Sequence, residues 1–194
     1  MVSVHGGGLK APLLVWAMAV AFLLLVTSLL IGSFTKPEFP AYQVGPSSDG
    51  TYTLDASAGD RWQRFDFARN AVVDSGSWDI AFRRNHVITA PGAGALDLGV
   101  LSLDSTADVP PDGYTATTFG ADTVNPAIGK WYAYSMWSHL LTSSHHVYAV
   151  HTADGRFVLF EVLAYYCREV GSACYTMRYK ASRPRTTGSP GARE

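Results

Sequence analysis

Histidine is the residue type in this 194-residue chain best suited to acid–base or metal chemistry, and there are six. His145 and His146 are adjacent, so on a strand their side chains would point to opposite faces and could not chelate one ion together. We interpret this pair as a loop or the entry to a strand. The other four histidines are scattered along the chain: His5, His86, His139 and His151.

Signatures of catalysis are missing from the sequence. It contains no G-x-S-x-G nucleophile elbow, no H-E-x-x-H zinc motif, no phosphate-binding P-loop and no C-x-x-C pair. Gly92-x-Gly94 has no third glycine at the spacing of a dinucleotide-binding loop, so we interpret it as a turn. The sequence therefore predicts a protein that is not an enzyme.

Acidic residues supply all the charges between Arg84 and Lys130. Carboxylates can bind calcium, but their spacing here matches no known calcium loop, and we interpret them as solvated turns. They are Asp97, Asp104, Asp108, Asp112 and Asp122. The formal net charge of −1 argues against a nucleic-acid partner, which needs a basic surface, and two cysteines are too few for a structural zinc site.

An uncharged segment occupies residues 11–34. As a helix it would extend roughly 36 Å, enough to cross a hydrocarbon core of about 30 Å. The alternative is a cleaved signal peptide, but the apolar run is longer than usual and the following S-F-T-K-P-E-F-P offers no small-x-small cleavage site. We therefore predict a transmembrane anchor, with lipid-facing or interfacial side chains at Pro12, Trp16, Phe22 and Phe34.

The charges that flank this segment suggest its orientation. Lys10 precedes it, whereas Lys36 is offset by Glu38 after it, which slightly favours a cytoplasmic N-terminus. The expected location is a bacterial inner (cytoplasmic) membrane, crossed once, with the bulk of the chain in the periplasm. The expected organisation is a cytoplasmic N-terminus (1–10), a transmembrane helix (11–34), a linker (35–49), a β domain (50–181) and a polar tail (182–194).

Strand patterns dominate the expected domain. The pair Asp154-Gly155 lies between two strand-like runs, 147–151 and 156–167, which predicts a β-hairpin. The second run is apolar on both faces except at Glu161, so it should be a central strand. A lone buried carboxylate is costly, so Glu161 should be either paired or at an exposed edge.

The two cysteines flank a second predicted turn. Cys167 ends the central strand, and Cys174 begins a run of alternating residues that reads as the next strand. In an oxidising periplasm this placement favours a cross-strand disulfide over two reduced thiols.

Two runs resemble the HmuY family of bacterial haem-binding proteins: W-D-I-A-F-R-R-N-H-V-I-T-A-P-G-A-G (78–94) and the segment 130–166, which contains V-H-T-A-D-G-R-F. The resemblance covers about residues 50–181. It implies an all-β fold of two packed, mostly antiparallel sheets, and a binding protein that holds haem between two side-chain ligands. Typical members are lipoproteins, whereas this chain has an apolar anchor and no lipid-acceptor cysteine.

The resemblance also suggests candidates for haem ligation. Haem needs two imidazole or thioether ligands on opposite sides of the iron, in an apolar slot. The region 91–130, where the family would be expected to place one ligand, contains no histidine and no methionine, which is a departure from the family pattern. Met136 and His139 are the best local candidates, because they lie in or beside the aromatic stretch 131–137, which could line such a slot. The alternative is that this stretch is part of an aromatic core.

Two functional hypotheses follow. The favoured one is a non-enzymatic accessory subunit, with no cofactor, that stabilises or bridges a larger membrane complex, such as a respiratory or photosynthetic one. Its partners would be integral membrane protein subunits and the lipid bilayer, and Ala17, Ala19 and Ala21 would let helices approach closely. The alternative is a membrane-tethered haem-binding protein of the HmuY type.

Overall fold

The computed structural model describes residues 11–34, 43–167 and 171–185. The expected cytoplasmic segment with His5, the first part of the linker and the end of the polar tail lie outside the described residues. The chain forms two compact units. One comprises the N-terminal helix and the short loop Ser135–Leu140, and the other comprises the rest of the β structure.

The helix α1 runs from Ala11 to Phe34, the bounds that the sequence predicted. It has no acidic residue in its first turn and no basic residue in its last. Within the described part of the chain, its residues Pro12–Phe34 form the one helix long and apolar enough to cross a membrane. The predicted anchor side chains Trp16, Phe22 and Phe34 are 72%, 66% and 84% exposed.

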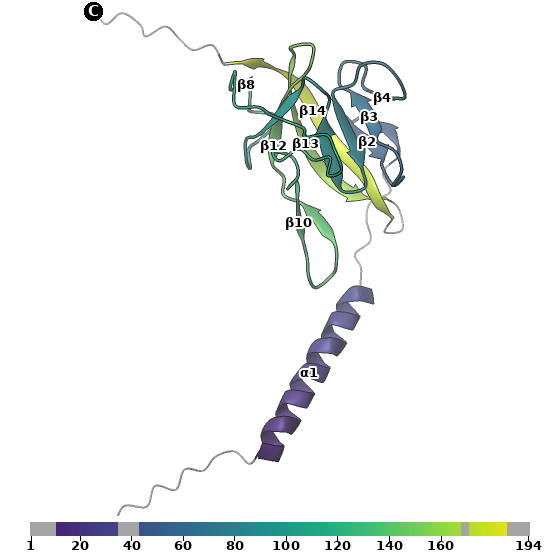
Figure 1. The fold of residues 1–194 in the computed structure, drawn as a ribbon, viewed down its shortest axis with the longest axis vertical. Coiled ribbons are helices and arrows are strands. Elements are labelled where there is room, and N and C mark those ends of the chain that lie inside the picture. The colour runs from purple at the N-terminus through teal and green to yellow at the C-terminus, as the bar shows by residue number, and fades with distance from the viewer. Residues whose placement is uncertain (1–10, 35–42, 168–170, 186–194) are drawn as a thin grey trace, which may run out of the picture. The chain divides into compact units, whose positions relative to one another are not determined.

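Strands make up nearly all the remaining regular structure, as expected (Figure 1). The first seven are β1 (Gly45–Pro46), β2 (Thr51–Asp55), β3 (Gln63–Asp66), β4 (Ala71–Val73), β5 (Ile80–Arg83), β6 (His86–Thr89) and β7 (Gly94–Asp97). The others are β8 (Asp108–Val109), β9 (Thr115–Ala116), β10 (Tyr132–Tyr134), β11 (Leu141–Ser143), β12 (Val147–His151), β13 (Phe157–Tyr166) and β14 (Ser172–Pro184).

These strands form a large sheet, a smaller sheet and a separate hairpin. The large sheet has the order β1-β2-β14-β13-β12-β7-β9, with β8 attached to β14. The smaller sheet has the order β4-β3-β5-β6, and β10 pairs only with β11. All pairs are antiparallel except β8 with β14. The predicted all-β, mostly antiparallel fold with one N-terminal apolar helix is thus confirmed.

Aromatic side chains join the two sheets. Phe65 of β3 lies 4.7 Å from Tyr52 of β2 and 5.6 Å from Tyr179 of β14, measured between ring centroids. Phe82 of β5 lies 4.7 Å from Tyr175 of β14. Edge-on and tilted contacts at these distances add to the burial of apolar area, so they fix the packing of one sheet on the other.

The predicted hairpin is formed by β12 and β13, and β13 lies inside the large sheet between β12 and β14. Glu161 is paired rather than at an edge. Its side chain is 7% exposed and lies 2.9 Å from Arg178 Nη2, with the second oxygen 3.2 Å from His145 Nδ1. Burial of this carboxylate is therefore tolerated because a cation on the neighbouring strand neutralises it.

Two strand boundaries lie beside contacts with other segments. In the W-D-I-A-F run, β5 begins at Ile80, directly after Asp79, whose carboxylate accepts a hydrogen bond from Phe67 N. At the other end, β14 continues through Ser182 to Pro184, in the segment expected to be tail, because its end pairs with β8.

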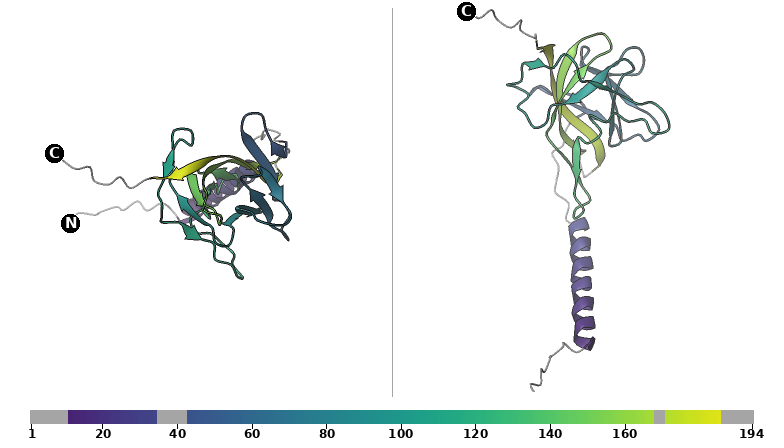
Figure 2. Two further views of the ribbon diagram at one scale, coloured as in Figure 1. Left: turned by 90° about the horizontal axis from the view of Figure 1, so that it is seen from above. Right: turned by 60° about the vertical axis from the view of Figure 1, so that its left-hand side comes forward.

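The hairpin of β10 and β11 projects from the β domain as a narrow two-stranded ribbon, seen best in the right-hand view of Figure 2. Its base is tied to the large sheet. Leu141 N donates to Tyr166 Oη at 2.8 Å, and Ser143 Oγ donates to the carbonyl of Val162 at 2.5 Å. The ring of Trp131, just before β10, is 1% exposed and packs on Tyr165 and Tyr175.

Candidate functional site

The predicted haem-ligand candidates lie in the loop between β10 and β11. Met136 is 72% exposed, and His139 is also exposed and has a left-handed backbone with φ of 56°. Haem ligation needs an apolar slot with ligands on both faces of the iron. Both side chains lie in one turn of the loop, three positions apart, and their assignment as haem ligands stays a prediction.

The adjacent histidines precede β12 in a loop, as the sequence predicted. His145 Nδ1 lies 3.2 Å from Glu161, whereas His146 Nδ1 lies 2.9 Å from Asp97. Each ring therefore pairs with a different carboxylate. Among the described residues, no group of three or more His, Cys, Asp or Glu side chains could hold a metal ion.

The predicted disulfide is present and joins Cys167 to Cys174. These cysteines lie at the end of β13 and near the start of β14, so the bond crosses the two long central strands at their turn. Disulfides persist in oxidising compartments, and this one is consistent with a domain outside the cytoplasm.

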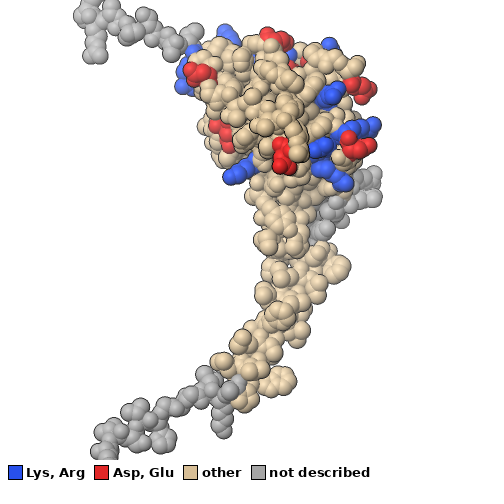
Figure 3. Space-filling view, in the orientation of Figure 1, with Lys and Arg blue, Asp and Glu red and all other residues tan. Residues whose placement is uncertain are grey.

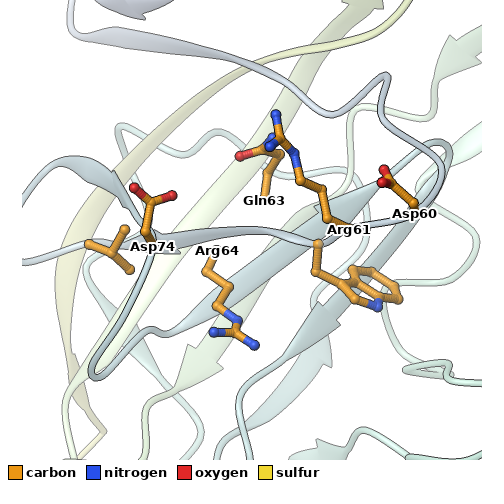
Figure 4. Close-up of a pocket in the computed structure, with 7 residues that line it drawn as sticks. Asp60, Arg61, Gln63, Arg64 and Asp74 are labelled. Carbon is orange, nitrogen blue, oxygen red and sulfur yellow. The ribbon is translucent and has the colours of Figure 1, made fainter.

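A hollow on the β domain lies along β3 and β4 of the smaller sheet. Its volume is about 450 Å³, and it is lined by Asp60, Arg61, Trp62, Gln63, Arg64, Val73 and Asp74. Figure 4 shows Arg61 and Gln63 on one side of the strand and Arg64 on the other, with Asp60 and Asp74 at the two ends. Two carboxylates, two guanidinium groups and an amide line it, so it offers charged and hydrogen-bonding groups.

Arginine and tryptophan side chains alternate on the outer surface of this sheet. The guanidinium carbon of Arg64 lies 5.8 Å from the centre of the Trp78 ring, and that of Arg83 lies 4.5 Å from the Trp62 ring. A second, smaller hollow of about 200 Å³ adjoins Trp62, Arg64 and Trp78 and also touches Phe119. Arginine and tryptophan are among the residues most enriched at the hot spots of protein–protein interfaces.

We call this surface the Arg–Trp face and define it by Trp62, Arg64, Trp78 and Arg83. Sequence reasoning did not identify this surface. The signal that could have found the site is the alternation of aromatic and basic residues in R-W-Q-R-F followed by W-D-I-A-F-R-R, because period-two spacing places Trp62 and Arg64 on the same outer surface.

Comparisons with known proteins rest on structure alone. No family model matches the chain, and no curated protein matches it. Solved structures do match: a candidate HmuY-like haem-binding protein from Bacteroides vulgatus has a TM-score of 0.59 and 20% identity over 71% of this chain and 97% of that one. The chain has an HmuY-like fold.

Two further structures agree with this assignment. A candidate lipoprotein from Bacteroides fragilis has a TM-score of 0.58 and 17% identity, covering 74% of this chain and 97% of that one. The apo form of an HmuY analogue from Tannerella forsythia has a TM-score of 0.56 and 14% identity, covering 70% of this chain and 95% of that one. The resemblance seen in the sequence is therefore confirmed at the level of the fold.

In this HmuY-like domain, an ion pair joins the two sequence runs that carried the resemblance. Arg156, just after the Asp154-Gly155 turn, donates from Nη2 to Asp79 of the W-D-I-A-F run at 3.1 Å. Its Nε also donates to Asp154 at 2.7 Å. Burial raises the pKa of Asp79, opposed by the hydrogen bond from Phe67 N and by the Arg156 charge. The ion pair of Arg156 with Asp79 connects the segment next to the smaller sheet with the β12–β13 hairpin.

Proposed function

We propose that this protein is a non-enzymatic, single-pass membrane protein whose HmuY-like domain lies on the periplasmic side and serves as an accessory subunit that stabilises or bridges a larger membrane complex. The observation that carries the proposal is the exposed apolar surface of α1. Its described side chains are mostly apolar and largely exposed. A helix of that kind needs lipid or other helices around it.

The β domain supports a binding role rather than a catalytic one. The hollow along β3 and β4 lies on the surface beside arginine and tryptophan side chains, and His145 and His146 each pair with a carboxylate. The Arg–Trp face suits contact with an acidic or aromatic surface of a neighbouring subunit. Because the anchor keeps the domain close to that subunit, modest contacts suffice for stable association.

Gentle detergent extraction of the native membrane tests this proposal. We expect the full chain to migrate on a native gel well above its monomer mass of 20.9 kDa and to co-purify with integral membrane proteins. Migration as a lone monomer across several mild detergents would refute the proposal.

Charge reversal on the Arg–Trp face sharpens the test. We expect Arg64→Glu to reduce co-purification of the partner at least severalfold, because it removes the cation and places a like charge against an acidic surface. Arg183→Glu, at the end of β14 and outside this face, is the matched control and should leave co-purification unchanged. Equal effects from both substitutions would argue against a role for the Arg–Trp face.

Haem binding is the second candidate, because solved structures of this fold include one described as haem-binding. The exposure of Met136 and His139 speaks against it, so we expect haem added to the purified full chain to give no saturable Soret band. A saturable band that disappears in His139→Ala would favour the haem-binding candidate over the accessory subunit.

A further inference from the structure

We propose that the loop Ser135–Leu140, at the tip of the β10–β11 hairpin, is a second membrane contact that lies in the interfacial layer of the bilayer beside the outer end of α1. The inference rests on the part of the proposed function in which α1 spans a membrane, and it requires no protein partner. Its occupant is lipid.

The composition of the hairpin is that of an interfacial segment. Residues 131–146 contain no Lys, Arg, Asp or Glu. Exposed apolar side chains gather at the tip, where Tyr134, Met136 and Trp137 are 48%, 72% and 50% exposed. Figure 3 shows that charged side chains on the visible face lie elsewhere on the β domain. Contiguous exposed apolar surface with a tryptophan and a tyrosine is typical of groups that lie at the level of lipid headgroups.

Hydrogen bonds within the loop satisfy several of its backbone polar groups, as a poorly hydrated environment requires. Ser135 N donates to the carbonyl of Leu140 at 2.9 Å, and His139 N donates to the carbonyl of Ser135 at 2.9 Å. Ser138 N donates to Ser135 Oγ at 3.2 Å. Because several of its polar backbone groups are already paired within the loop, moving the tip from water toward lipid costs less than it would for an open loop.

The depth of the tip follows from its contact with the helix. Gly32 is buried, and a Cβ atom at this position would lie 2.5 Å from Trp137 Nε1, so the indole packs directly on the glycine. Gly32 is about nine residues, or roughly 13–14 Å, from Leu23 at the middle of the Pro12–Phe34 span. Half the hydrocarbon thickness is about 15 Å, so Trp137 lies near the edge of the hydrocarbon, where tryptophan is favoured.

The base of the hairpin is hydrogen-bonded to β13 through Leu141 and Ser143. These hydrogen bonds connect the tip, through the base of the hairpin, to the large sheet.

Lipid quenching of a fluorescent label tests the proposal. Both cysteines are bonded in the disulfide, so a single introduced cysteine labels selectively. We would place an NBD fluorophore on Met136→Cys in the full chain, reconstituted in phosphatidylcholine vesicles that contain shallow doxyl-labelled lipid. The matched control is Val100→Cys, since Val100 is also 72% exposed but lies in the loop after β7.

We expect blue-shifted emission and at least threefold stronger lipid quenching at position 136 than at position 100. Quenching at position 136 as weak as at position 100 would overturn the proposal, and is also the outcome expected if the tip instead binds a protein. Because the vesicles contain no partner, the result is independent of whether the protein is a subunit of a complex.

A second variant tests the contact with the helix. Gly32→Leu keeps α1 apolar but displaces the Trp137 ring, so we expect quenching at position 136 to fall by half or more while the chain stays in the membrane after an alkaline wash. Trp137→Asp, which leaves the helix unchanged, should reduce quenching similarly by placing a charge at the tip. Undiminished quenching in both variants would contradict the placement beside Gly32.

Discussion

Substitution of Arg178 by methionine should strongly destabilise the β domain. The Glu161 side chain is 7% exposed in the central strand and lies 2.9 Å from Arg178 Nη2 and 3.0 Å from Arg178 Nε. Arg178→Met leaves the carboxylate buried with His145, whose own side chain is 56% exposed, as its remaining ionic partner in the described structure.

The size of the effect follows from burial. Removing one partner of a buried ion pair costs about 3–5 kcal/mol. The contact of Arg178 with Asp104 adds little, because the Asp104 side chain is 77% exposed and a surface pair contributes about 0–1 kcal/mol. At roughly 3–4 °C per kcal/mol for a domain of this size, a loss of about 3 kcal/mol lowers the melting temperature by roughly 10 °C.

The assay is thermal unfolding of the full chain in detergent, followed by near-ultraviolet circular dichroism of the aromatic core. Asp104→Asn is the matched control and should shift melting by no more than a few degrees. The double variant Glu161→Met with Arg178→Met should recover most of the loss, because two apolar side chains leave no charge to neutralise. The reasoning is refuted if Arg178→Met melts within about 2 °C of the wild type, or if the double variant is no more stable than the single one.

Three further predictions concern the β domain. Cys174→Ser breaks a disulfide whose partners are seven residues apart, so the free energy of unfolding measured by denaturant titration should fall by about 2–3 kcal/mol. A reductant should lower the stability of the wild type by the same amount and should have no further effect on the variant. Burial raises the pKa of Tyr148 to about 12, so between pH 10 and 12 the folded state keeps a proton that the unfolded chain loses, and the free energy of unfolding falls as pH rises. Tyr148→Phe should make that fall shallower by up to about 2–3 kcal/mol in melts from pH 9 to 12, and an unchanged slope would contradict this assignment. Asn125 is fully buried, and its side chain is hydrogen-bonded to two backbone N–H groups and a backbone carbonyl. Asn125→Ala should therefore lower the free energy of unfolding, measured by thermal unfolding, by about 1–3 kcal/mol. Unchanged stability would show that water replaces the amide.

The elements that the sequence predicted well are those with a strong local signal. Asp154-Gly155 between two apolar runs specifies the β12–β13 hairpin, and the apolar length of 11–34 specifies the helix. The expectation that Glu161 is either paired or at an exposed edge followed from the cost of a lone buried charge, and the structure pairs it with Arg178 on the next strand.

The elements that were missed depend on contacts between distant residues. The ion pair of Arg156 with Asp79 joins positions 77 residues apart, and no local pattern indicates it. β8 and β9 have two residues each, too few for any periodicity. By composition, the aromatic stretch around Met136 was either a candidate ligand slot or part of the core. In the structure its two ends differ in burial, because Trp131 lies in the core and the tip of the hairpin is exposed.

The fold explains why composition could not separate these roles. A short antiparallel hairpin positions one end against a sheet and the other end away from it, so adjacent aromatic residues reach different surroundings. Which end is buried is set by hydrogen bonds from Leu141 and Ser143 to β13, and those partners follow much later in the chain.

Photo-crosslinking from α1 in the native membrane tests the central claim most directly. A photoreactive residue placed in turn at Ala17, Ala19 and Phe22 probes different sides of the helix. If the protein is a subunit of a membrane complex, adducts with one or two defined integral membrane proteins should form strongly from one side of the helix and weakly from the other. Lipid adducts alone from every position would contradict the account.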